Sequence, residues 1–301
     1  MTTFGDQVFQ FGGEPVGGAR FSSPWATPWF VDGVNGSDGT GRGKRPDRSL
    51  ASIQAAVTAA KRGDVMYIRP KTYVVGTGFD RYVEDVTVPL ATHDLSIIGV
   101  VNTLNPEFGV RWKHLTAQCL DNWAPALHVE NIGFFAEDAT YCVLLSDLAA
   151  GTKLGANGST FYKCVFKGAN FQVLSGGTGV TIERCKFTPH SSGVVAQLNI
   201  SCSAKLGRQF VVKWCDFLDA IGAVASGPYI AIAPPCTEVL IDHCTFGQLP
   251  TGGCYISAAG ANYGQLSNCN FGVADMTKAT GLVLGSIIAT ACYDGKVALI
   301  D

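Results

Sequence analysis

The chain has 301 residues, of which 47% are hydrophobic and 15% charged, and its formal net charge is −2. This composition excludes an intrinsically disordered chain, which needs low hydrophobicity and high charge. The near-neutral balance provides no overall basic field for nucleic acid or an anionic membrane surface, and no apolar stretch reaches the roughly 18 residues of a membrane-spanning helix. We therefore expect neither nucleic-acid binding nor membrane insertion.

Residues 1–29 are rich in Gly, Pro and aromatic side chains and show neither helical nor strand periodicity. They lack the basic and apolar regions of a signal peptide. The aromatic residues are Phe4, Phe9, Phe11, Phe21, Trp25 and Trp29. So many aromatic side chains are unusual in a free tail, and they predict an anchoring arm that binds a partner or a neighbouring subunit. Packing of the arm along its own chain explains the composition equally well.

The next segment predicts a strand, a loop and a helix in succession. The strand covers Trp29–Val31, and a Gly-rich loop covers Asp32–Gly43. One apolar helical face then follows, formed by Leu50, Ile53, Val57 and Ala60. With Ser49 as the N-cap and a Lys-Arg-Gly ending, the helix is predicted at about residues 49–62, before a strand at Val65–Ile68. Such a helix would cover the open end of a repetitive β-structure.

A short pattern, apolar-x-x-Cys-x-Phe, recurs along the chain. It reads FYKCVF at 161–166, IERCKF at 182–187, VKWCDF at 212–217, IDHCTF at 241–246 and LSNCNF at 266–271. Relaxed matches are VENIGF at 129–134 and LSIIGV at 95–100, which place the Cys position at 98, 132, 164, 185, 215, 244 and 269. Short apolar phrases at this spacing, separated by turn residues, predict a β-solenoid with one such strand per coil.

Stacked coils place equivalent residues in register about 4.8 Å apart. The Cys and Phe positions would then form two inward ladders. On the outside, Glu183, Lys213 and Asp242 would alternate in charge on successive coils, which is mildly favourable. The eleven cysteines include no CxxC pair, so they are predicted to be small core residues and not disulfides or zinc ligands. No metal and no cofactor are predicted.

The stretch FVDGVNGSDGTGRGKRPDRSLASIQAAVTAAKRGDVMYIRPKTY, residues 30–73, resembles the opening of the pectate-lyase-like right-handed parallel β-helix proteins. Lys71 stands where that superfamily usually has Gly. The resemblance implies an all-β fold, a single-stranded right-handed parallel β-helix over residues 30–301 with a short N-terminal capping helix. It leaves the function open, because this fold serves lyases, hydrolases, adhesins and bacteriophage tailspikes alike.

Polysaccharide hydrolysis is one chemistry that the fold allows. Inverting glycoside hydrolases hold two carboxylates roughly 6.5–9.5 Å apart. Glu183 and Asp242, two coils apart in one column, would lie about 9–10 Å apart, with Asp216 nearby. Lys213 between the two acids favours a solvated charged face instead.

Lyase, metal and nucleophile chemistry have weaker signals. Arg184 and Lys186 have the basic side chains of a calcium-dependent lyase without its cluster of Asp ligands. The loop from Asp32 to Asp38 has Asp and Asn at calcium-like spacing without a bidentate Glu, and turn chemistry explains it equally well.

No ligand spacing connects the histidines, which are His93, His114, His128, His190 and His243. A Cys-His nucleophile at 243–244 is not expected, because Cys244 belongs to the predicted core.

A secreted polysaccharide-degrading enzyme would carry a secretion signal, whereas a virion protein folds in the host cytoplasm and is released by lysis. We therefore expect a bacteriophage virion structural protein, a spike, fibre or decoration element on capsid or tail, located in the virion. Residues 1–29 would attach it to other virion proteins, and the resemblance to tailspike-type β-helices implies a homotrimer. The alternative is a glycoside hydrolase or lyase of the same fold, with Glu183, Asp216 and Asp242 as its carboxylates.

Host surface glycans are a further candidate partner, because flat aromatic faces suit stacking on sugar rings. The loop aromatics that could do this are Trp112, Trp123, Tyr229, Tyr255 and Tyr263. Local packing of most of these side chains is the favoured explanation, and glycan contact is the alternative.

Overall fold

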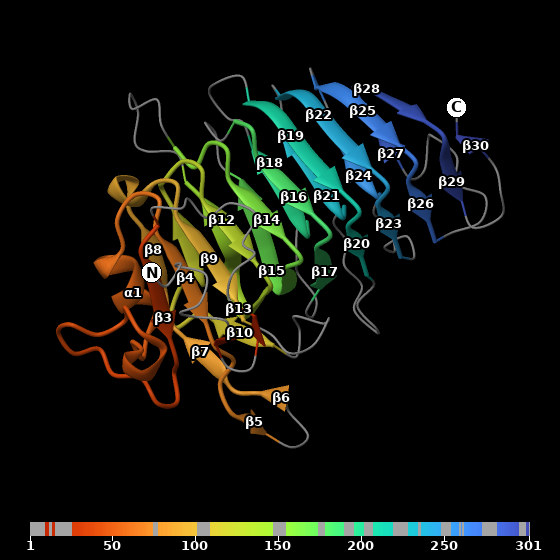
Figure 1. The fold of residues 1–301 in the computed structure, drawn as a ribbon. Helices are drawn as coiled ribbons and strands as arrows, with labels where there is room; N and C mark the ends of the chain where they lie inside the picture. Colours follow the sequence, from red (N-terminus) through yellow and green to blue (C-terminus); the bar gives the residue numbers. More distant parts are fainter. Residues whose placement is uncertain are drawn as a thin grey trace.

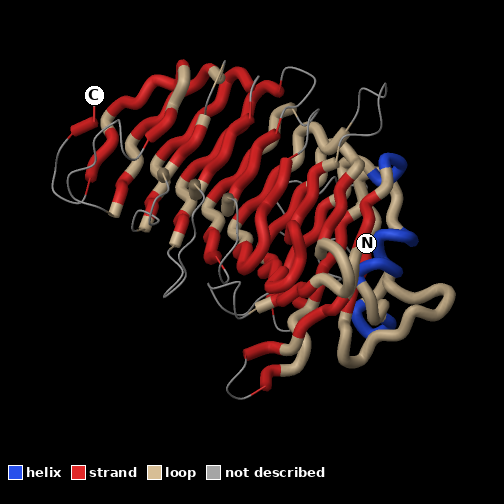
Figure 2. Tube along the Cα trace, turned by 180° about the vertical axis from the view of Figure 1, so that it is seen from behind, coloured by secondary structure: helices blue, strands red, loops and turns tan. Residues whose placement is uncertain are grey.

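The protein forms a right-handed parallel β-helix in the computed structural model, with coils stacked from an N-terminal helix toward the C-terminus (Figures 1 and 2). The structure describes residues 10–11, 14–15, 26–74, 78–100, 109–146, 155–173, 178–189, 196–201, 207–218, 228–233, 236–247, 254–258, 260, 262–272, 282–294 and 299–300. Within these ranges, no helix is long and apolar enough to cross a membrane. The predicted fold class is confirmed, and each coil passes through three faces in turn.

The first face is a ten-stranded parallel sheet. Its strands are β3 (Pro28–Val31), β4 (Val65–Ile68), β9 (Ser96–Gly99), β12 (His128–Glu130), β14 (Thr160–Tyr162), β16 (Thr181–Glu183), β19 (Gly207–Lys213), β22 (Cys236–Asp242), β25 (Tyr263–Ser267) and β28 (Ser286–Thr290). The strand predicted at 65–68 is confirmed, and the one predicted at 29–31 begins one residue earlier, at Pro28.

The second and third faces belong to one sixteen-stranded sheet. Two long strands run through the bend that joins them, β13 (Ile132–Leu145) and β15 (Val165–Val173). The second face also holds β7 (Arg81–Val83), β10 (Val110–Lys113), β17 (Lys186–Pro189), β20 (Asp216–Phe217), β23 (Thr245–Phe246), β26 (Asn270–Phe271) and β29 (Cys292–Asp294). The third face holds β8 (Val86–Val88), β11 (Leu120–Asn122), β18 (Leu198–Ser201), β21 (Ile230–Ala233), β24 (Ile256–Ser257) and β27 (Leu282–Val283).

Short antiparallel pairs and turns complete the fold. The pairs are β1 (Gln10–Phe11) with β2 (Glu14–Pro15), β5 (Tyr73–Val74) with β6 (Gly78–Phe79), and β30 (Leu299–Ile300) with β29. Two 3-10 turns are η2 (Pro46–Arg48) and η3 (Leu90–Thr92).

Helix α1 (Ile53–Ala59) packs against β3 and β8 at the N-terminal end of the stack (Figure 1). It buries Ile53, Ala56 and Val57 in the main core. Ser52 is its N-cap, since the Ser52 Oγ accepts a hydrogen bond of 3.2 Å from the backbone N–H of Ala55. The capping helix is therefore confirmed.

The predicted helix bounds of 49–62 and the predicted N-cap at Ser49 are wrong. Ser49 Oγ donates to the carbonyl of Pro46 at 2.7 Å, and Leu50 forms a parallel bridge with Val31. The chain therefore remains extended until Ser52, because tertiary pairing with the first strand outweighs the local helical pattern.

In the seven coils from β12 to β28, one residue in the left-handed conformation makes the corner between the first and second faces. These corner residues are Asn131, Lys163, Arg184, Trp214, His243, Asn268 and Ala291, with φ between 49° and 56°. This conformation is uncommon for residues that have a Cβ, so packing between coils must hold it in place. The turn directs the following side chain, at the Cys position, into the core.

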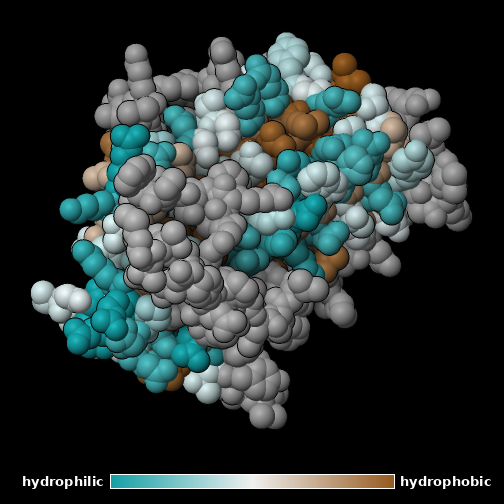
Figure 3. Space-filling view, viewed as in Figure 1, coloured by the Kyte–Doolittle hydropathy of each residue, from teal (hydrophilic) through white to brown (hydrophobic). Residues whose placement is uncertain are grey.

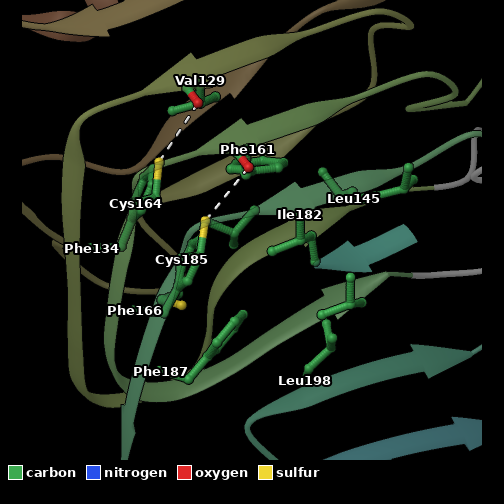
Figure 4. Close-up of a cluster of buried hydrophobic side chains, with 14 of the residues drawn as sticks. Val129, Phe134, Leu145, Phe161, Cys164, Phe166, Ile182, Cys185, Phe187 and Leu198 are labelled. Atoms are coloured by element: carbon green, nitrogen blue, oxygen red, sulfur yellow. Dashed lines mark hydrogen bonds between the residues drawn. The ribbon is translucent and has the colours of Figure 1, made fainter. Parts of the chain in front are cut away.

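The predicted cysteine ladder is confirmed. Its members Cys164, Cys185, Cys215, Cys244 and Cys269 are at most 1% exposed, and Cys292, outside the recognised repeat, extends it with 0% exposure. The thiols donate to backbone carbonyls of the neighbouring coil. Cys164 Sγ lies 3.7 Å from the Val129 oxygen and Cys185 Sγ lies 3.5 Å from the Phe161 oxygen (Figure 4).

The predicted phenylalanine stack is confirmed as well. Adjacent ring centroids lie 4.7–5.4 Å apart through Phe134, Phe166, Phe187, Phe217, Phe246 and Phe271. Figure 4 shows the first three of these rings. Trp112 continues the stack, with its centroid 5.3 Å from that of Phe134. Because β10 and β13 pair in register, Val110 and Trp112 occupy the Cys and Phe positions of their coil.

The first repeat match, at 95–100, is wrong by two residues. Ile97 pairs with Val129, and Ile98 pairs with Glu130. Ile98 thus leaves the Cys ladder and joins an outer cluster. That cluster consists of Phe30, Val65, Tyr67, Ile98 and Val100. Both sides of β9 are buried, so hydrophobicity alone cannot distinguish the two registers.

Candidate functional site

Two columns of side chains run in register along the corner between the first and second faces, and we call them together the corner row. One column is the last residue of each first-face strand from β12 to β25, which gives Glu130, Tyr162, Glu183, Lys213, Asp242 and Ser267. The other is the left-handed residue that follows, which gives Asn131, Lys163, Arg184, Trp214, His243 and Asn268. Because neighbouring parallel strands lie about 4.8 Å apart, side chains of successive coils can touch.

Trp214 is the exposed aromatic side chain at the centre of the corner row, with 44% of its surface exposed. The Arg184 Cζ lies 5.3 Å from the Trp214 ring centroid on one side. The His243 ring centroid lies 6.2 Å away on the other, and Lys213 Nζ lies 5.1 Å from the Trp214 ring. An indole fixed between polar side chains, and still open to solvent, can stack on the flat apolar surface of a ligand.

Toward the N-terminus, the next part of the corner row consists of two cationic side chains, Arg184 and Lys163, that lie over the ring of Tyr162. Arg184 Cζ lies 5.9 Å from the Tyr162 centroid, and Arg184 Nη1 donates to the Tyr162 hydroxyl at 3.4 Å. Lys163 Nζ lies 5.1 Å from the same ring. Tyr162 itself is only 5% exposed. The tyrosine therefore supports the two cations, and the cations are what solvent meets.

The predicted alternation of charge along the corner is confirmed. Glu183 pairs in register with Lys213, and Lys213 with Asp242. Lys213 Nζ lies 3.1 Å from Glu183 Oε2. The structure therefore brings the two predicted carboxylates into one column but places an ammonium group between them, bound to one of them.

Asp242 is held by its own neighbours. Its Oδ1 accepts hydrogen bonds of 2.7 Å from Ser267 Oγ and 3.0 Å from Asn268 Nδ2, and its Oδ2 lies 2.8 Å from His243 Nδ1. Partial burial acts to raise the pKa of Asp242, but these contacts outweigh it and the pKa lies below its usual value. These contacts favour the ionised form of Asp242, whereas the proton donor of a glycosidase needs a raised pKa.

Asp216, the third predicted carboxylate, lies on a different face. It is exposed in β20 and pairs in register with Lys186 and Thr245. Its chain neighbour Cys215 points into the core with 0% exposure. The predicted catalytic group thus separates into a column on the first face and a single acid on the second.

Three of the five loop aromatics predicted for glycan contact are core residues. Trp112 and Tyr255 are 0% exposed and Tyr229 is 4% exposed, so sugar stacking by these three is ruled out. Trp123 and Tyr263 are 39% and 55% exposed, and their contact with glycan stays a prediction. Local packing is the correct interpretation for the majority.

Sequence reasoning missed Trp214. The residue occupies an unspecified position of the repeat, directly before Cys215, where the pattern carries no information about exposure. Its position was nonetheless a usable signal. A residue that precedes an inward side chain at a sharp turn points away from the core, so a Trp there is exposed.

The Gly-rich loop uses its acidic side chains as acceptors for backbone groups. Asp32 Oδ1 accepts from the N–H groups of residues 34–35 at 2.9 and 3.1 Å, and Asp32 Oδ2 pairs with Arg69 Nη1 at 2.9 Å. Asp38 Oδ1 accepts from the N–H groups of residues 51–52. Turn chemistry thus accounts for the residues that suggested calcium. Among the residues that the structure describes, no group of three or more His, Cys, Asp or Glu could hold a metal ion.

The structure places His93 and His128 beside carboxylates and Cys244 in the core. His93 lies beside Asp94 at 2.9 Å and His128 beside Glu130 at 3.4 Å, and His190 lies outside the described residues. Burial raises the pKa of Cys244 well above its usual value. A thiol of this kind stays protonated and unreactive at neutral pH.

The structure describes little of the aromatic arm. Trp29 belongs to β3, is 8% exposed, and donates from Nε1 to Asp64 Oδ2 at 2.8 Å. Trp29 is therefore a core residue and not one of the arm side chains that could bind a partner. Phe11 lies in β1 and pairs with Glu14 of β2. Outside the described residues lie Phe4, Phe9, Phe21 and Trp25, whose anchoring role stays a prediction.

Comparison with known proteins supports the fold. No family model and no curated protein matches the sequence. Among solved structures, the chain is similar to pectate lyase Pel9A, with a TM-score of 0.55 and 10% identity over 89% of this chain and 77% of that one. It is also similar to ORF18 of Geobacillus virus E2, with a TM-score of 0.48 and 11% identity over 81% of this chain and 54% of that one.

A further similar structure is the pectin methylesterase from Aspergillus niger, with a TM-score of 0.47 and 13% identity over 92% of this chain and 88% of that one. Identities this low bear on fold and not on activity. Together with the sheet topology, the similarity to the lyase shows that the chain has the pectate-lyase-like right-handed parallel β-helix fold.

Proposed function

We propose that the protein is a bacteriophage virion structural protein, a spike, fibre or decoration element, whose β-helix binds surface glycans at the corner row without cleaving them. The observation that carries the glycan-binding part of the proposal is the exposed Trp214 ring between Arg184 and His243. Flat aromatic surfaces flanked by hydrogen-bonding groups are what a sugar-binding surface requires. Figure 3 shows hydrophilic residues, interrupted by a smaller hydrophobic patch, over the described part of the visible face.

The state of the carboxylates favours binding over cleavage. Glu183 is paired with Lys213 at 3.1 Å, and Asp242 accepts hydrogen bonds from Ser267 and Asn268. An inverting hydrolase would need one of its acids protonated and the other free to activate water. The hydrolase or lyase alternative therefore rests on the fold alone.

The free cysteines favour the interpretation that the chain folds in a reducing cytoplasm, as we expect for a virion protein released by lysis. The ladder thiols are free, buried and stacked on adjacent coils. Disulfides form and persist in oxidising compartments, where a chain with so many closely spaced thiols would risk wrong pairings before it folded.

Two measurements on the same set of glycans test the proposal. Purified protein is incubated with bacterial capsular and lipopolysaccharide glycans, and both bound glycan and newly formed reducing or unsaturated ends are measured. We expect binding without new ends, and loss of binding in Trp214→Ala. Tyr293→Ala is the matched control, because Tyr293 is 42% exposed at the last described coil. Cleavage that Glu183→Gln or Asp242→Asn abolishes would overturn the proposal in favour of the enzyme.

Attachment and assembly form the second part of the proposal. The arm aromatics Phe4, Phe9, Phe11, Phe21 and Trp25 would bind other virion proteins, and three chains would associate side by side as a homotrimer. Deleting residues 2–25, which leaves β3 intact, should abolish incorporation into particles while the β-helix still folds. Normal incorporation, or a monomer by light scattering, would contradict this part.

A further inference from the structure

The corner row also indicates what kind of glycan it would take. Resting on the proposed function, we propose that the corner row selects glycans with anionic substituents, carboxylate or phosphate. Arg184 and Lys163 would bind the anion while the sugar ring lies on Trp214. The argument rests on how charge is distributed on the two sides of the indole.

Arg184 is a cation whose charge is poorly compensated. Its Nε lies 4.0 Å from Glu183 Oε1, whereas Lys213 Nζ lies 3.1 Å from the other oxygen of the same carboxylate. Glu183 is therefore neutralised mainly by Lys213. The Arg184 side chain is 51% exposed, and a guanidinium has five N–H donors in a planar fork that fits carboxylate or phosphate.

Arg184 is also held in position to receive an anion next to a stacked ring. Tyr162 accepts a 3.4 Å hydrogen bond from Nη1 and lies under the guanidinium. Trp214 follows Arg184 on the next coil, with a Cζ-to-centroid distance of 5.3 Å. A ring on Trp214 would therefore bring its substituent to Arg184 within one sugar unit. Lys163, one coil further, adds a second cation about 4.8 Å along the column.

On the opposite side of Trp214, the charged group is a carboxylate and not a cation. Asp242 is ionised there, with its pKa below the usual value, and it holds the Nδ1 side of the His243 ring at 2.8 Å. An anion would be repelled at this end, whereas sugar hydroxyls could reach the exposed His243 ring. The corner row therefore orients a chain, with its anionic group toward Lys163 and its neutral hydroxyls toward His243.

Three glycans of different charge test this proposal on the full chain. Hyaluronan supplies carboxylates, glycerol-phosphate teichoic acid supplies phosphates, and dextran is neutral. We expect the protein to bind at least one anionic polymer about tenfold more tightly than dextran at low salt, with the difference shrinking as salt rises. Arg184→Gln and Lys163→Gln should remove this preference, and Arg45→Gln, in the N-terminal loop, should not.

The outcomes separate the two proposals. Equal affinity for all three polymers, with loss of binding in Trp214→Ala, would overturn the anion preference and leave glycan binding standing. An Arg184→Gln variant that keeps the full preference would overturn the anion preference as well. If neither these polymers nor the wider glycan panel binds, both proposals fail. Circular dichroism of each variant checks that the β-helix is intact.

Discussion

The rings of Phe187 and Phe217, thirty residues apart in the sequence, lie 4.7 Å apart with their planes within 4° of each other. Each ring comes from the second face of its coil and contacts the rings above and below. Parallel coils in register bring identical side chains into such contact. The stack therefore links successive coils into one core, and each ring contributes to two coil interfaces.

Removal of one ring should be costly. We expect Phe217→Ala to lower the free energy of unfolding by about 3–5 kcal/mol, because the cavity lies in the middle of the stack. Urea unfolding followed by circular dichroism measures the change. Tyr263→Ala removes a 55% exposed aromatic side chain and should change stability by no more than about 0.5 kcal/mol. Similar losses in both variants would show that the stack has no special role.

The core thiols should be protected from modification. Nine of the ten described cysteines are buried, and Cys254 is partly exposed. Burial raises the pKa of Cys142 to about 12, so this thiol is both inaccessible and protonated. A thiol reagent such as DTNB at pH 8 should label native protein rapidly only at Cys254, apart from Cys202, which lies outside the described residues. Rapid labelling of the ladder in folded protein would contradict the packing.

Acid should weaken the Gly-rich loop through Asp32. Burial acts to raise the pKa of Asp32, but hydrogen bonds from residues 34–35 and Arg69 outweigh it, and the folded-state pKa lies below its usual value. The unfolded-state pKa is about 3.9. Asp32 therefore stabilises the fold above that pH, and the contribution is lost as pH falls through the lower folded value.

The matching experiment compares Asp32→Asn with the natural chain across pH 7 to 2. At neutral pH the variant should lose about 1–3 kcal/mol, the size of hydrogen bonds to a buried charged group. At the acid end the two stabilities should converge. Parallel curves over the whole range would show that Asp32 does not carry this part of the pH dependence.

The capping helix should depend on residues at its start. Glu84 accepts hydrogen bonds from the backbone N–H groups of Ile53 and Gln54 at 3.0 and 2.9 Å, and Ser52 is the N-cap. Ser52→Ala should cost about 1 kcal/mol, and Glu84→Ala at least as much, because it leaves two N–H groups without their acceptor. Ser37→Ala provides the comparison, since Ser37 is exposed and lies outside the helix. Equal losses from Ser52→Ala and Ser37→Ala would show that Ser52 does not cap the helix.

The sequence was sufficient to predict the solenoid and its two ladders. A Cys or Phe at one position of a repeat needs no knowledge of distant contacts, because every coil repeats the same environment. For this reason the ladder from Cys164 to Cys269 and the alternation of Glu183, Lys213 and Asp242 are confirmed. The pattern is defined by its residue types and ends where these change. Trp112 and Cys292 therefore do not match it, although the structure places them in the same ladders.

Only the tertiary structure decided which side chains meet solvent and which neighbours they have. The sequence does not reveal that Ile98 faces outward, since both sides of its strand are buried. Nor does it reveal that Trp112 is enclosed while Trp214 is open. Exposure depends on the lateral stacking of coils and on the left-handed corners, both of which join residues far apart in the chain. The sequence therefore determined the fold and its core period, and the stacking of coils determined the surface on which the proposed function depends.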